Sequence, residues 1–396
     1  MSEPHKIRIL TFTSLFPSST QPRHGIFVET RLKHLLASGQ AEANVVAPVP
    51  WFPFTGKKFG KYAEYAAVPR QEKRDNINVF HPRYPVLPKI GMNLAPISMA
   101  AACMPTVRKL IRSGQDFDII DAHYFYPDGV AAALLGRQLG KPVVITARGS
   151  DINLLPEFRI PRKMILMAAS QASGLITVSA ALKERLIGIG VQPEKIKVLR
   201  NGVDLEKFSP VGKQSQTLGL PSPLLLSVGN LVQSKGHDLV IEALSLIPEM
   251  HLAIIGEGEE KENLRLLARK LGMEGRVKFL GNLPQKDLPG YYSAADALVL
   301  ASSREGWANV LLEAMACGTP AIATRVGGNP EVVASADAGI LADARTPEAI
   351  AEAMRKLFLN YPEEGATRRY AEQFSWHDTT EGQLELFSTI LGRQKR

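Results

Sequence analysis

The sequence predicts an α/β protein built from two doubly wound domains, and three observations carry this prediction. Short apolar runs alternate with helical patterns along the chain, which is typical of parallel sheets covered by helices on both faces. The alternation begins a second time after a polar stretch with Gly and Pro, residues 203–223, where a domain boundary is expected. At 396 residues the chain is also too long for one ordinary core.

In the first series, apolar runs of strand length precede or follow helical patterns. Strands are expected over residues 7–13, 43–49, 117–123, 142–147, 174–179 and 196–200, and helices over 128–139 and 180–189. The stretch between the second and third strands, 51–85, is expected to be irregular.

The second series follows the same rule and ends in an additional helix. Strands are expected over 223–229, 251–256, 276–281, 296–302 and 320–324, and helices over about 236–247, 259–271, 309–317 and 347–359. Residues 374–392 then predict a terminal amphipathic helix, because Leu384, Phe387 and Leu391 recur at helical spacing.

Charge is distributed unevenly between the two halves of the chain. Residues 1–200 hold 27 Lys and Arg against 14 Asp and Glu, whereas residues 201–396 hold 20 against 25. Such an asymmetry favours a polyanionic partner for the first half only. Nucleic acid and an anionic membrane surface are the two ordinary candidates.

Cysteine content and the N-terminus predict a cytoplasmic protein. Cys103 and Cys317 lie in apolar surroundings far apart in sequence, as expected of buried free thiols in a reducing compartment. The polar start, "MSEPHKIRIL", is not expected to be a signal peptide. The weakly apolar stretch 94–104 is too short to span a bilayer.

Aromatic residues and lysines are interleaved in the stretch 51–85. Trp51, Phe52, Phe54, Phe59, Tyr62 and Tyr65 occur with Lys57, Lys58 and Lys61. This mixture suits a membrane interface, where rings lie at the boundary and lysines meet anionic lipid. An ordinary surface loop that covers part of the core is the alternative.

Two common nucleotide-binding signatures are absent. "GEGEEK" (256–261) is acidic and lacks the third glycine of a dinucleotide fingerprint, and "GNLVQSKGH" (229–237) lacks the glycine that precedes a P-loop lysine. Both departures disfavour a dinucleotide dehydrogenase and a P-loop NTPase.

A polar turn follows the first strand of each series. The turn 12–28 ends in Gly25 at a predicted helix start, where backbone amides can meet an anion; a purely structural turn is the alternative. In the second series, Lys235 stands beside Gly236 at a helix start and can pair with phosphate. A solvated lysine in a turn is the alternative there.

Polar residues also follow two later strands of the first series. His123 ends one strand, and Arg148, Gly149 and Asp151 follow the next. In open α/β sheets the carboxyl ends of the strands line the ligand crevice. These residues are therefore candidate site residues, against the alternative that His123 is structural.

Two glutamates give the strongest signal. Glu305 lies in the turn after the strand 296–302, before the free amides of residues 306–309, and Glu313 lies one turn into the following helix. A carboxylate accepts hydrogen bonds from neighbouring hydroxyls, so Glu313 suits a ribose. "GGNPE" (327–331) adds a glycine turn that allows close backbone approach to a ligand.

These motifs resemble the retaining glycosyltransferases of family 4, which share the GT-B fold. The resemblance is carried by "EGWANVLLEAMACGTPAIAT" with "GGNPEVV", "SVGNLVQSKGHDLVIEAL", "RNGVDLEKFSP" and "FSWHDTT". It implies an acceptor-binding Rossmann-like domain over 1–205, a nucleotide-sugar-binding one over 206–375, and a helix over 376–396 that crosses back to the N-terminal domain. The two domains are expected to face a cleft.

The resemblance also implies roles for single residues. Glu305, His123 and Lys235 would be catalytic, with Lys235 neutralising the diphosphate and Glu305 binding the sugar. Donor contacts would come from Gly25, Asn230, Lys235, Asn282, Leu283, Glu305, Gly306, Trp307, Ala308, Asn309 and Glu313. Arg148 and Asp151 would line the acceptor side. No cofactor and no metal ion are expected.

Three positions depart from the family pattern. Asn230 stands where Arg is usual, Trp307-Ala308 where Phe-Gly is usual, and Arg148 where His is frequent. Arg23, Arg148 or Arg325 are candidates for the phosphate charge that Asn230 lacks.

The expected reaction is hexosyl transfer, with retention, from a nucleotide-diphosphate sugar to a lipid-linked or cell-envelope saccharide. UDP is favoured as the nucleotide and GDP is an option, and peripheral attachment to the inner face of the plasma membrane is a further hypothesis. Two alternatives are a GT-B nucleotide-sugar epimerase and a non-catalytic polyanion-binding module. Scattered basic residues without a nucleic-acid fold signature disfavour the latter.

Overall fold

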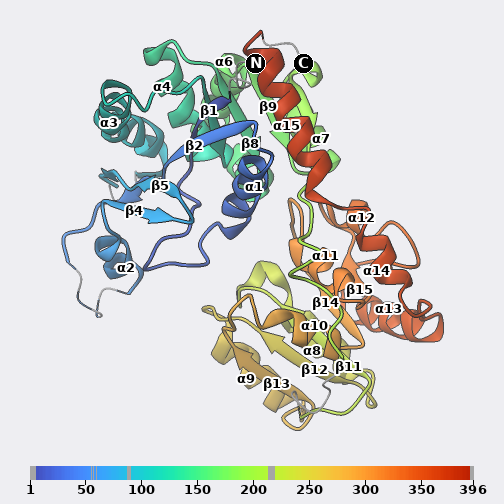
Figure 1. Cartoon of the computed structure of the whole chain (residues 1–396). Helices are drawn as coiled ribbons and strands as arrows, with labels where there is room; N and C mark the ends of the chain where they lie inside the picture. The colour runs from blue at the N-terminus through green and yellow to red at the C-terminus, as the bar shows by residue number, and fades with distance from the viewer. Residues whose placement is uncertain are drawn as a thin grey trace. The chain divides into compact units, whose positions relative to one another are not determined.

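The computed structural model describes residues 6–54, 56, 58, 60–86, 91–212 and 219–392, without the side chain of Lys61. It divides into two compact units. Unit 1 comprises Met1–Arg200 with His377–Arg396, and unit 2 comprises Asn201–Trp376. In Figure 1 unit 1 is blue to green with the red C-terminal helix, and unit 2 runs from green to orange-red.

Unit 1 contains two sheets. Its strands are β1 (Ile7–Phe12), β2 (Ala41–Val46), β3 (Val49–Pro50), β4 (Gln71–Arg74), β5 (Ile77–Phe80), β6 (Arg83–Tyr84), β7 (Ile119–His123), β8 (Val143–Ala147), β9 (Gly174–Thr177) and β10 (Ile196–Val198). The main sheet has the order β10-β9-β8-β7-β1-β2-β5-β4, and β3 pairs with β6 in a second, small sheet. Only β4 runs antiparallel to its neighbour, so the main sheet is essentially parallel.

Helices cover the main sheet of unit 1. They are α1 (Ile26–Ala37), α2 (Lys61–Ala67), α3 (Gly91–Arg112), α4 (Val130–Leu139), α5 (Ser150–Asn153), α6 (Arg159–Gln171), α7 (Ala180–Gly188) and α15 (Trp376–Ile390). One apolar core joins Ile119 and Ile176 of the sheet to Leu35 of α1 and to Leu384 and Phe387 of α15. The C-terminal helix therefore completes the core of unit 1, and Figure 1 shows it in red.

Unit 2 has one parallel sheet of the doubly wound kind. Its strands are β11 (Leu224–Val228), β12 (His251–Ile255), β13 (Val277–Gly281), β14 (Ala297–Leu300), β15 (Ala321–Thr324) and β16 (Gly339–Ala342), in the order β13-β12-β11-β14-β15-β16. Consecutive strands thus run outward in both directions from the centre. The strand order reverses between β11 and β14, which is the switch point where such sheets bind ligands.

The helices of unit 2 bury its sheet on both faces. They are α8 (His237–Ser245), α9 (Lys261–Lys270), α10 (Leu288–Ala294), α11 (Asn309–Ala316), α12 (Asn329–Val332), α13 (Pro347–Leu359) and α14 (Ala366–Ala371). One core joins Leu252 and Val299 of the sheet to Val240 of α8, Leu264 of α9 and Met354 of α13. The predicted fold class, two Rossmann-like α/β domains, is confirmed.

The chain passes between the units earlier than the polar stretch 203–223 indicated. The division falls between Arg200 and Asn201. Val203 and Phe208 are buried, and Arg368 of α14 donates to the carbonyl of Phe208, so this part of the predicted linker belongs to unit 2. A polar composition did not reveal these apolar anchors. Part of the stretch, 213–218, lies outside the described residues.

Several elements were not expected. The stretch 51–85 holds α2, β4, β5 and β6 rather than irregular chain alone. Helix α3 continues through Pro96 and Pro105, and strand β16 is too short and mixed for a periodicity argument. In each case tertiary packing overrode a weak local signal. Lys57 and Phe59 of the aromatic and lysine stretch lie outside the described residues.

Candidate functional site

The loops that follow β11 and β14 meet at the switch point of unit 2. Gly236, with φ +69°, lies so close to Ala301 that a Cβ would stand 2.2 Å from its carbonyl oxygen. The amide of Ser303 donates to the carbonyl of Ser234 at 2.8 Å. Lys235 Nζ consequently lies 2.5 Å from Glu305 Oε1. Two residues that the sequence singled out separately therefore form one ion pair.

Glu305 is held from two further sides. The hydroxyl of Ser302 donates to Glu305 Oε1 at 2.7 Å, and the hydroxyl of Thr324 donates to the carbonyl of Ser302 at 2.6 Å. The loop after β15 also approaches, because a Cβ on Gly327 would stand 1.9 Å from the carbonyl oxygen of Glu305. Three consecutive loops of the sheet edge thus position one carboxylate. The ion pair stays partly accessible, with side chains 28% and 11% exposed for Lys235 and Glu305.

Glu313 lies in α11 beside a buried tyrosine. The hydroxyl of Tyr292, in α10, donates to Glu313 Oε2 at 2.8 Å. Burial raises the pKa of Glu313, while the hydrogen bond from Tyr292 and the charge of Lys207 oppose that rise. Lys207 in turn donates to the side chain of Gln285 at 2.6 Å. Neither Tyr292 nor Gln285 carried a sequence signal. Tyr292 reaches Glu313 only through the packing of α10, and Gln285, which precedes α10, also bonds to Glu313.

The remaining predicted donor residues occupy the same edge of the unit 2 sheet. Asn230 is exposed just after β11, and Asn282 and Leu283 follow β13, the outer strand on that side. The turn before α11 comprises Gly306, Trp307 and Ala308, all buried. Asn309 begins α11, and its side-chain oxygen accepts from Asn201 at 3.1 Å.

In unit 1, His123 ends β7 in a buried polar cluster. Its Nδ1 lies 2.7 Å from Arg148 Nη2, and its Nε2 lies 3.2 Å from Asp121 Oδ2. A guanidinium only donates, so Nδ1 accepts the hydrogen bond from Arg148. Nε2 therefore carries the ring proton and donates a hydrogen bond to Asp121. The structure therefore unites two predicted residues, His123 and Arg148, with Asp121. Alternation along β7 already places Asp121 and His123 on one face, a signal that was present in the sequence.

The surroundings of His123 keep its ring neutral. Burial lowers its pKa to about 4, the charge of Arg148 adds to that effect, and Asp121 opposes it. Because both ring nitrogens face protein groups and the residue is 1% exposed, the geometry favours an orienting role over proton transfer at neutral pH.

Asp151 and Gly25 make close contacts with the backbone around them. The carboxylate of Asp151 accepts from the backbone amides of Phe125, Arg148 and Gly149. It therefore braces the turn that carries Arg148. Gly25 is buried in the left-handed conformation before α1, against the backbone of Leu15.

Two further buried polar residues reach the His123 cluster. Gln383 of α15 donates through Nε2 to Asp121 Oδ2 at 2.8 Å, and its Oε1 accepts from Arg31 Nε at 2.8 Å. Sequence reasoning missed both residues. Gln383 adjoins the apolar stripe of α15, and Arg31 lies on a helix whose buried face was not assigned.

Comparisons with known proteins show the family of this chain. The family model described as Glycosyltransferase Family 4 matches residues 64–207, and that described as Glycosyl transferases group 1 matches residues 212–374. The Bacillus subtilis glycosyltransferase TuaC, provisionally named for teichuronic acid biosynthesis, is 30% identical over 365 residues, 88% of this chain and 89% of that protein. The chain is a family 4-like glycosyltransferase.

Solved structures show the same fold for this glycosyltransferase. Sucrose-phosphate synthase from Thermosynechococcus elongatus has a TM-score of 0.77 at 20% identity, covering 98% of this chain and all (100%) of that one. Anabaena Alr3699/HepE, solved in complex with UDP, has a TM-score of 0.71 at 22% identity, covering 97% and 100%. These likenesses establish the GT-B fold, and the expected transferase activity of class EC 2.4 is confirmed by the family.

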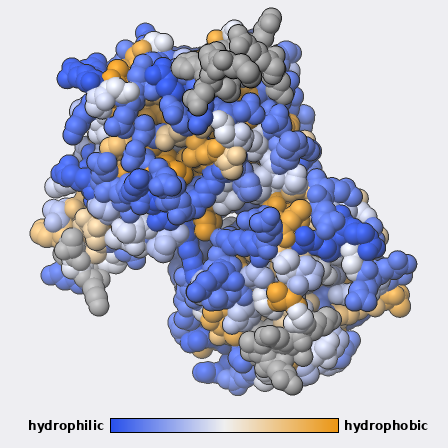
Figure 2. Space-filling view, in the orientation of Figure 1, coloured by the Kyte–Doolittle hydropathy of each residue, from blue (hydrophilic) through white to orange (hydrophobic). Residues whose placement is uncertain are grey.

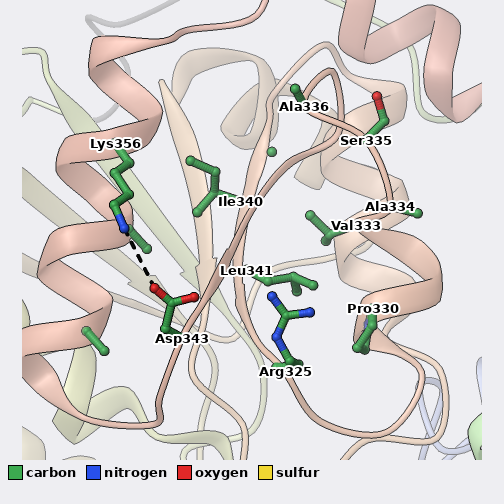
Figure 3. A pocket seen from close by; sticks show the side chains of 13 residues that line it. Arg325, Pro330, Val333, Ala334, Ser335, Ala336, Ile340, Leu341, Asp343 and Lys356 are labelled. Carbon is green, nitrogen blue, oxygen red and sulfur yellow. Dashed lines mark ion pairs between the residues drawn. The ribbon is translucent and has the colours of Figure 1, made fainter.

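A separate cavity of about 530 Å³ lies elsewhere in unit 2 of the glycosyltransferase. Figure 3 shows the guanidinium of Arg325 directed into it, near Leu341 of β16 and Pro330 of α12, with the ion pair of Lys356 and Asp343 (3.7 Å) beside it. Arg325, one of the candidates for a phosphate charge, lines this cavity, whereas none of the predicted catalytic, donor-binding or acceptor-side residues does.

Three other expectations concern the whole glycosyltransferase. Both cysteines are buried and free, as predicted. Among the described residues, no helix combines the length and apolar character that a membrane span requires. The same residues contain no group of three His, Cys, Asp or Glu side chains arranged to hold a metal ion.

Proposed function

We propose that this glycosyltransferase moves a hexose, with retention of configuration, from a nucleotide-diphosphate sugar to a hydroxyl of a lipid-linked or cell-envelope saccharide. The observation that carries the proposal is the Lys235–Glu305 contact at the switch point of unit 2. An ammonium and a carboxylate at one sheet edge offer a partner for the diphosphate and an acceptor for sugar hydroxyls.

The proposed roles follow from the charges and contacts of these groups. When the bond from the sugar C1 to the diphosphate oxygen breaks, the diphosphate leaves with the electron pair, and Lys235 with the amides of residues 306–309 offsets the developing charge. The oxygen of the acceptor hydroxyl bonds to C1, and its proton passes to the leaving diphosphate. Glu305, held by Ser302, accepts from the sugar, and Glu313, held by Tyr292, accepts from the ribose.

The nature of the donor and acceptor is inferred from the relatives. HepE of Anabaena was solved with UDP-glucose, which supports a UDP-sugar as the donor. GDP-sugars are the second option and are included in the donor panel below. TuaC and the lipopolysaccharide core glycosyltransferase LpsE of Rhizobium meliloti, 31% identical over 53% of this chain and 59% of its own length, are named for envelope polysaccharides. The reported relatives lend no support to an epimerase.

A donor panel tests the proposal. We expect a UDP-sugar among UDP-, GDP- and ADP-sugars to raise the melting temperature, and Lys235→Ala to abolish that rise. Lys261→Ala is the matched control, because Lys261 forms an exposed ion pair with Glu257 at 2.8 Å in the same unit. A rise that survives Lys235→Ala, or no rise with any donor, overturns the donor site. The anomeric coupling constant of the product, measured by NMR, separates retention from inversion.

We also propose that unit 1 meets an anionic membrane surface. Trp51, Phe54 and Tyr62 are 57%, 56% and 59% exposed, and the rings of Phe52 and Tyr62 lie 5.1 Å apart. Figure 2 shows orange residues among blue ones on the face of the molecule that it views. With the excess of Lys and Arg in residues 1–200, exposed aromatic rings match a surface of anionic lipid.

Vesicle flotation tests this surface. We expect binding to vesicles with anionic lipid at low salt, weakened by a Trp51→Ser, Phe54→Ser double substitution. Leu266→Ser is the control, because Leu266 is 59% exposed in unit 2. Equal flotation of the two variants, or no flotation of the unchanged protein, contradicts the membrane proposal.

A further inference from the structure

The polar cluster around His123 extends into the C-terminal helix through Gln383. Arg31, Asp121, His123 and Gln383 are each at most 2% exposed, and Arg148 is 8% exposed. Four hydrogen bonds join these residues one after another in space. They run from Arg31 to Gln383 (2.8 Å), Gln383 to Asp121 (2.8 Å), His123 to Asp121 (3.2 Å) and Arg148 to His123 (2.7 Å). Two of these residues, Arg31 and Gln383, come from helices α1 and α15.

For each of these hydrogen bonds, only one assignment of donor and acceptor is chemically consistent. Arg31 and Arg148 can only donate, so Gln383 must offer its oxygen to Arg31 and its amide nitrogen to Asp121. Asp121 then receives from Gln383 and His123 on the same oxygen, Oδ2. The amide of Gln383 is therefore not free to flip without placing two donors, or two acceptors, face to face.

The charges in the cluster explain why the hydrogen bonds of Asp121 depend on Gln383. Burial tends to raise the pKa of Asp121, yet His123, Arg31 and Arg148 together hold it below its ordinary value. Oδ1 of Asp121 has no hydrogen-bond partner among the described residues. Gln383 is thus one of only two donors described for a buried carboxylate, which is expensive to leave unpaired.

We propose that Gln383 is a positioning residue of the transferase site: by orienting Asp121, it holds the ring of His123 where Arg148 can donate to Nδ1, and so maintains the tautomer and orientation of His123. The helix that completes the core of unit 1 is in this way part of the site and more than a covering element. The proposal rests on the function proposed above as far as it concerns catalysis, whereas the state of His123 is independent of any substrate.

Imidazole nitrogen NMR of ¹⁵N-histidine-labelled full-length protein tests the proposal directly. His123 is assigned by the signal lost in His123→Gln. We expect the unchanged protein to show a neutral ring protonated at Nε2. Gln383→Leu removes both hydrogen bonds of the amide and frees Asp121 to move. The ring of His123 can then turn away from Arg148 Nη2, which otherwise requires a bare Nδ1, so we expect a mixture of the two tautomers of His123.

Gln383→Glu tests the charge coupling. It keeps an acceptor for Arg31 and directs a second carboxylate toward Asp121, so the protonation midpoint of His123 should rise by about one pH unit or more. The charged groups that act on His123 are Asp121 of β7, Arg148 after β8 and Arg31 of α1, and Asp151 of α5 acts in turn on Arg148. Because these groups carry charges of both signs, the diagnostic result is the direction of the change. The protonation midpoint of His123 should move to a higher pH.

Glu385→Gln is the matched control on the same helix. Glu385 is exposed and pairs with Lys197 of β10 at 2.6 Å, so its substitution changes a contact of α15 without touching the cluster. It should leave the tautomer and midpoint of His123 unchanged. If Gln383→Leu and Gln383→Glu also leave them unchanged in folded protein, Gln383 is structural only and the proposal is overturned.

Kinetics connect the cluster with transfer. Once a donor is identified, Gln383→Leu should lower kcat about tenfold or more while the KM for the nucleotide sugar stays within about twofold, since the donor contacts proposed above lie in unit 2. A changed ring state with unchanged kcat would overturn the role in the site. If no donor is ever turned over, the proposed function fails, yet the NMR result still decides whether Gln383 controls His123.

Discussion

The polar groups at the end of β7 and those that follow β11 and β14 differ in their exposure to solvent. In unit 1, His123, Asp121 and Arg148 are buried and bonded to one another. In unit 2, Lys235 and Glu305 form a pair that is still partly exposed. A buried network holds its members in place, whereas an accessible ion pair can exchange its partner for a ligand at small cost. We therefore expect substitutions in the first to lower stability strongly, whatever their effect on turnover, and those in the second to change turnover with little loss of stability.

Asp121→Ala gives the largest expected change in stability. It leaves Arg31 and Arg148 buried without their carboxylate, so the free energy of unfolding should fall by about 3–5 kcal/mol. Urea denaturation measures the loss. The control is Asp116→Ala, which breaks a partly exposed pair with Lys141 and should cost about 1 kcal/mol or less. Similar losses in both variants would end the contrast between buried and accessible pairs.

Glu305→Gln should show the reverse behaviour. Turnover should fall by about 10²–10³, the range for removing one group that stabilises a transition state. The melting temperature should change little because the pair is accessible. Ser302→Ala, which removes one donor to Glu305, should cost about tenfold. Glu257→Gln serves as the control at an exposed ion pair; rates near the unchanged protein in Glu305→Gln would refute the assignment.

Gly236→Ala and Gly272→Ala separate backbone conformation from close packing. The two glycines have φ of +69° and +67°, yet only a Cβ at Gly236 would collide, with the carbonyl oxygen of Ala301. Gly272→Ala should cost about 1 kcal/mol of stability from conformation alone. Gly236→Ala should cost roughly two to three times as much and weaken donor binding, because Lys235 is displaced. Equal effects would show that the loop contact does not position Lys235.

A buried histidine in each unit predicts sensitivity to mild acid. Burial lowers the pKa of His237 to about 4, as it does for His123. Between pH 6.5, the ordinary pKa of histidine, and about pH 4, both histidines bind a proton in the unfolded chain but stay neutral in the folded chain. Stability should therefore be full above pH 6.5 and fall as the pH decreases toward 4, by at most about 1.4 kcal/mol per pH unit for each histidine.

His237→Asn tests the share of unit 2 in that slope. Unfolding free energies measured between pH 7 and 4.5 should decline less steeply than in the unchanged protein, even if the value at pH 7 is lower. The exposed His377 supplies the control, His377→Asn, which should keep the original slope. An unaltered slope in His237→Asn would assign the acid sensitivity to other groups.

The sequence by itself determined the fold class and the positions from which the candidate residues emerge. Alternating apolar runs and helical patterns depend on neighbouring residues, so they are legible without the structure, and they placed Lys235, Glu305 and His123 at strand ends. Family resemblance then added the roles expected of them.

Only the tertiary structure decided which side chains meet. Lys235 reaches Glu305 across 70 positions, and Gln383 reaches Asp121 across 262. Such contacts depend on the order of the strands, the close approach of Gly236 to Ala301, and the packing of α15, none of which is encoded in a local period. The buried charges of unit 1 were likewise invisible, because burial is a property of the completed core.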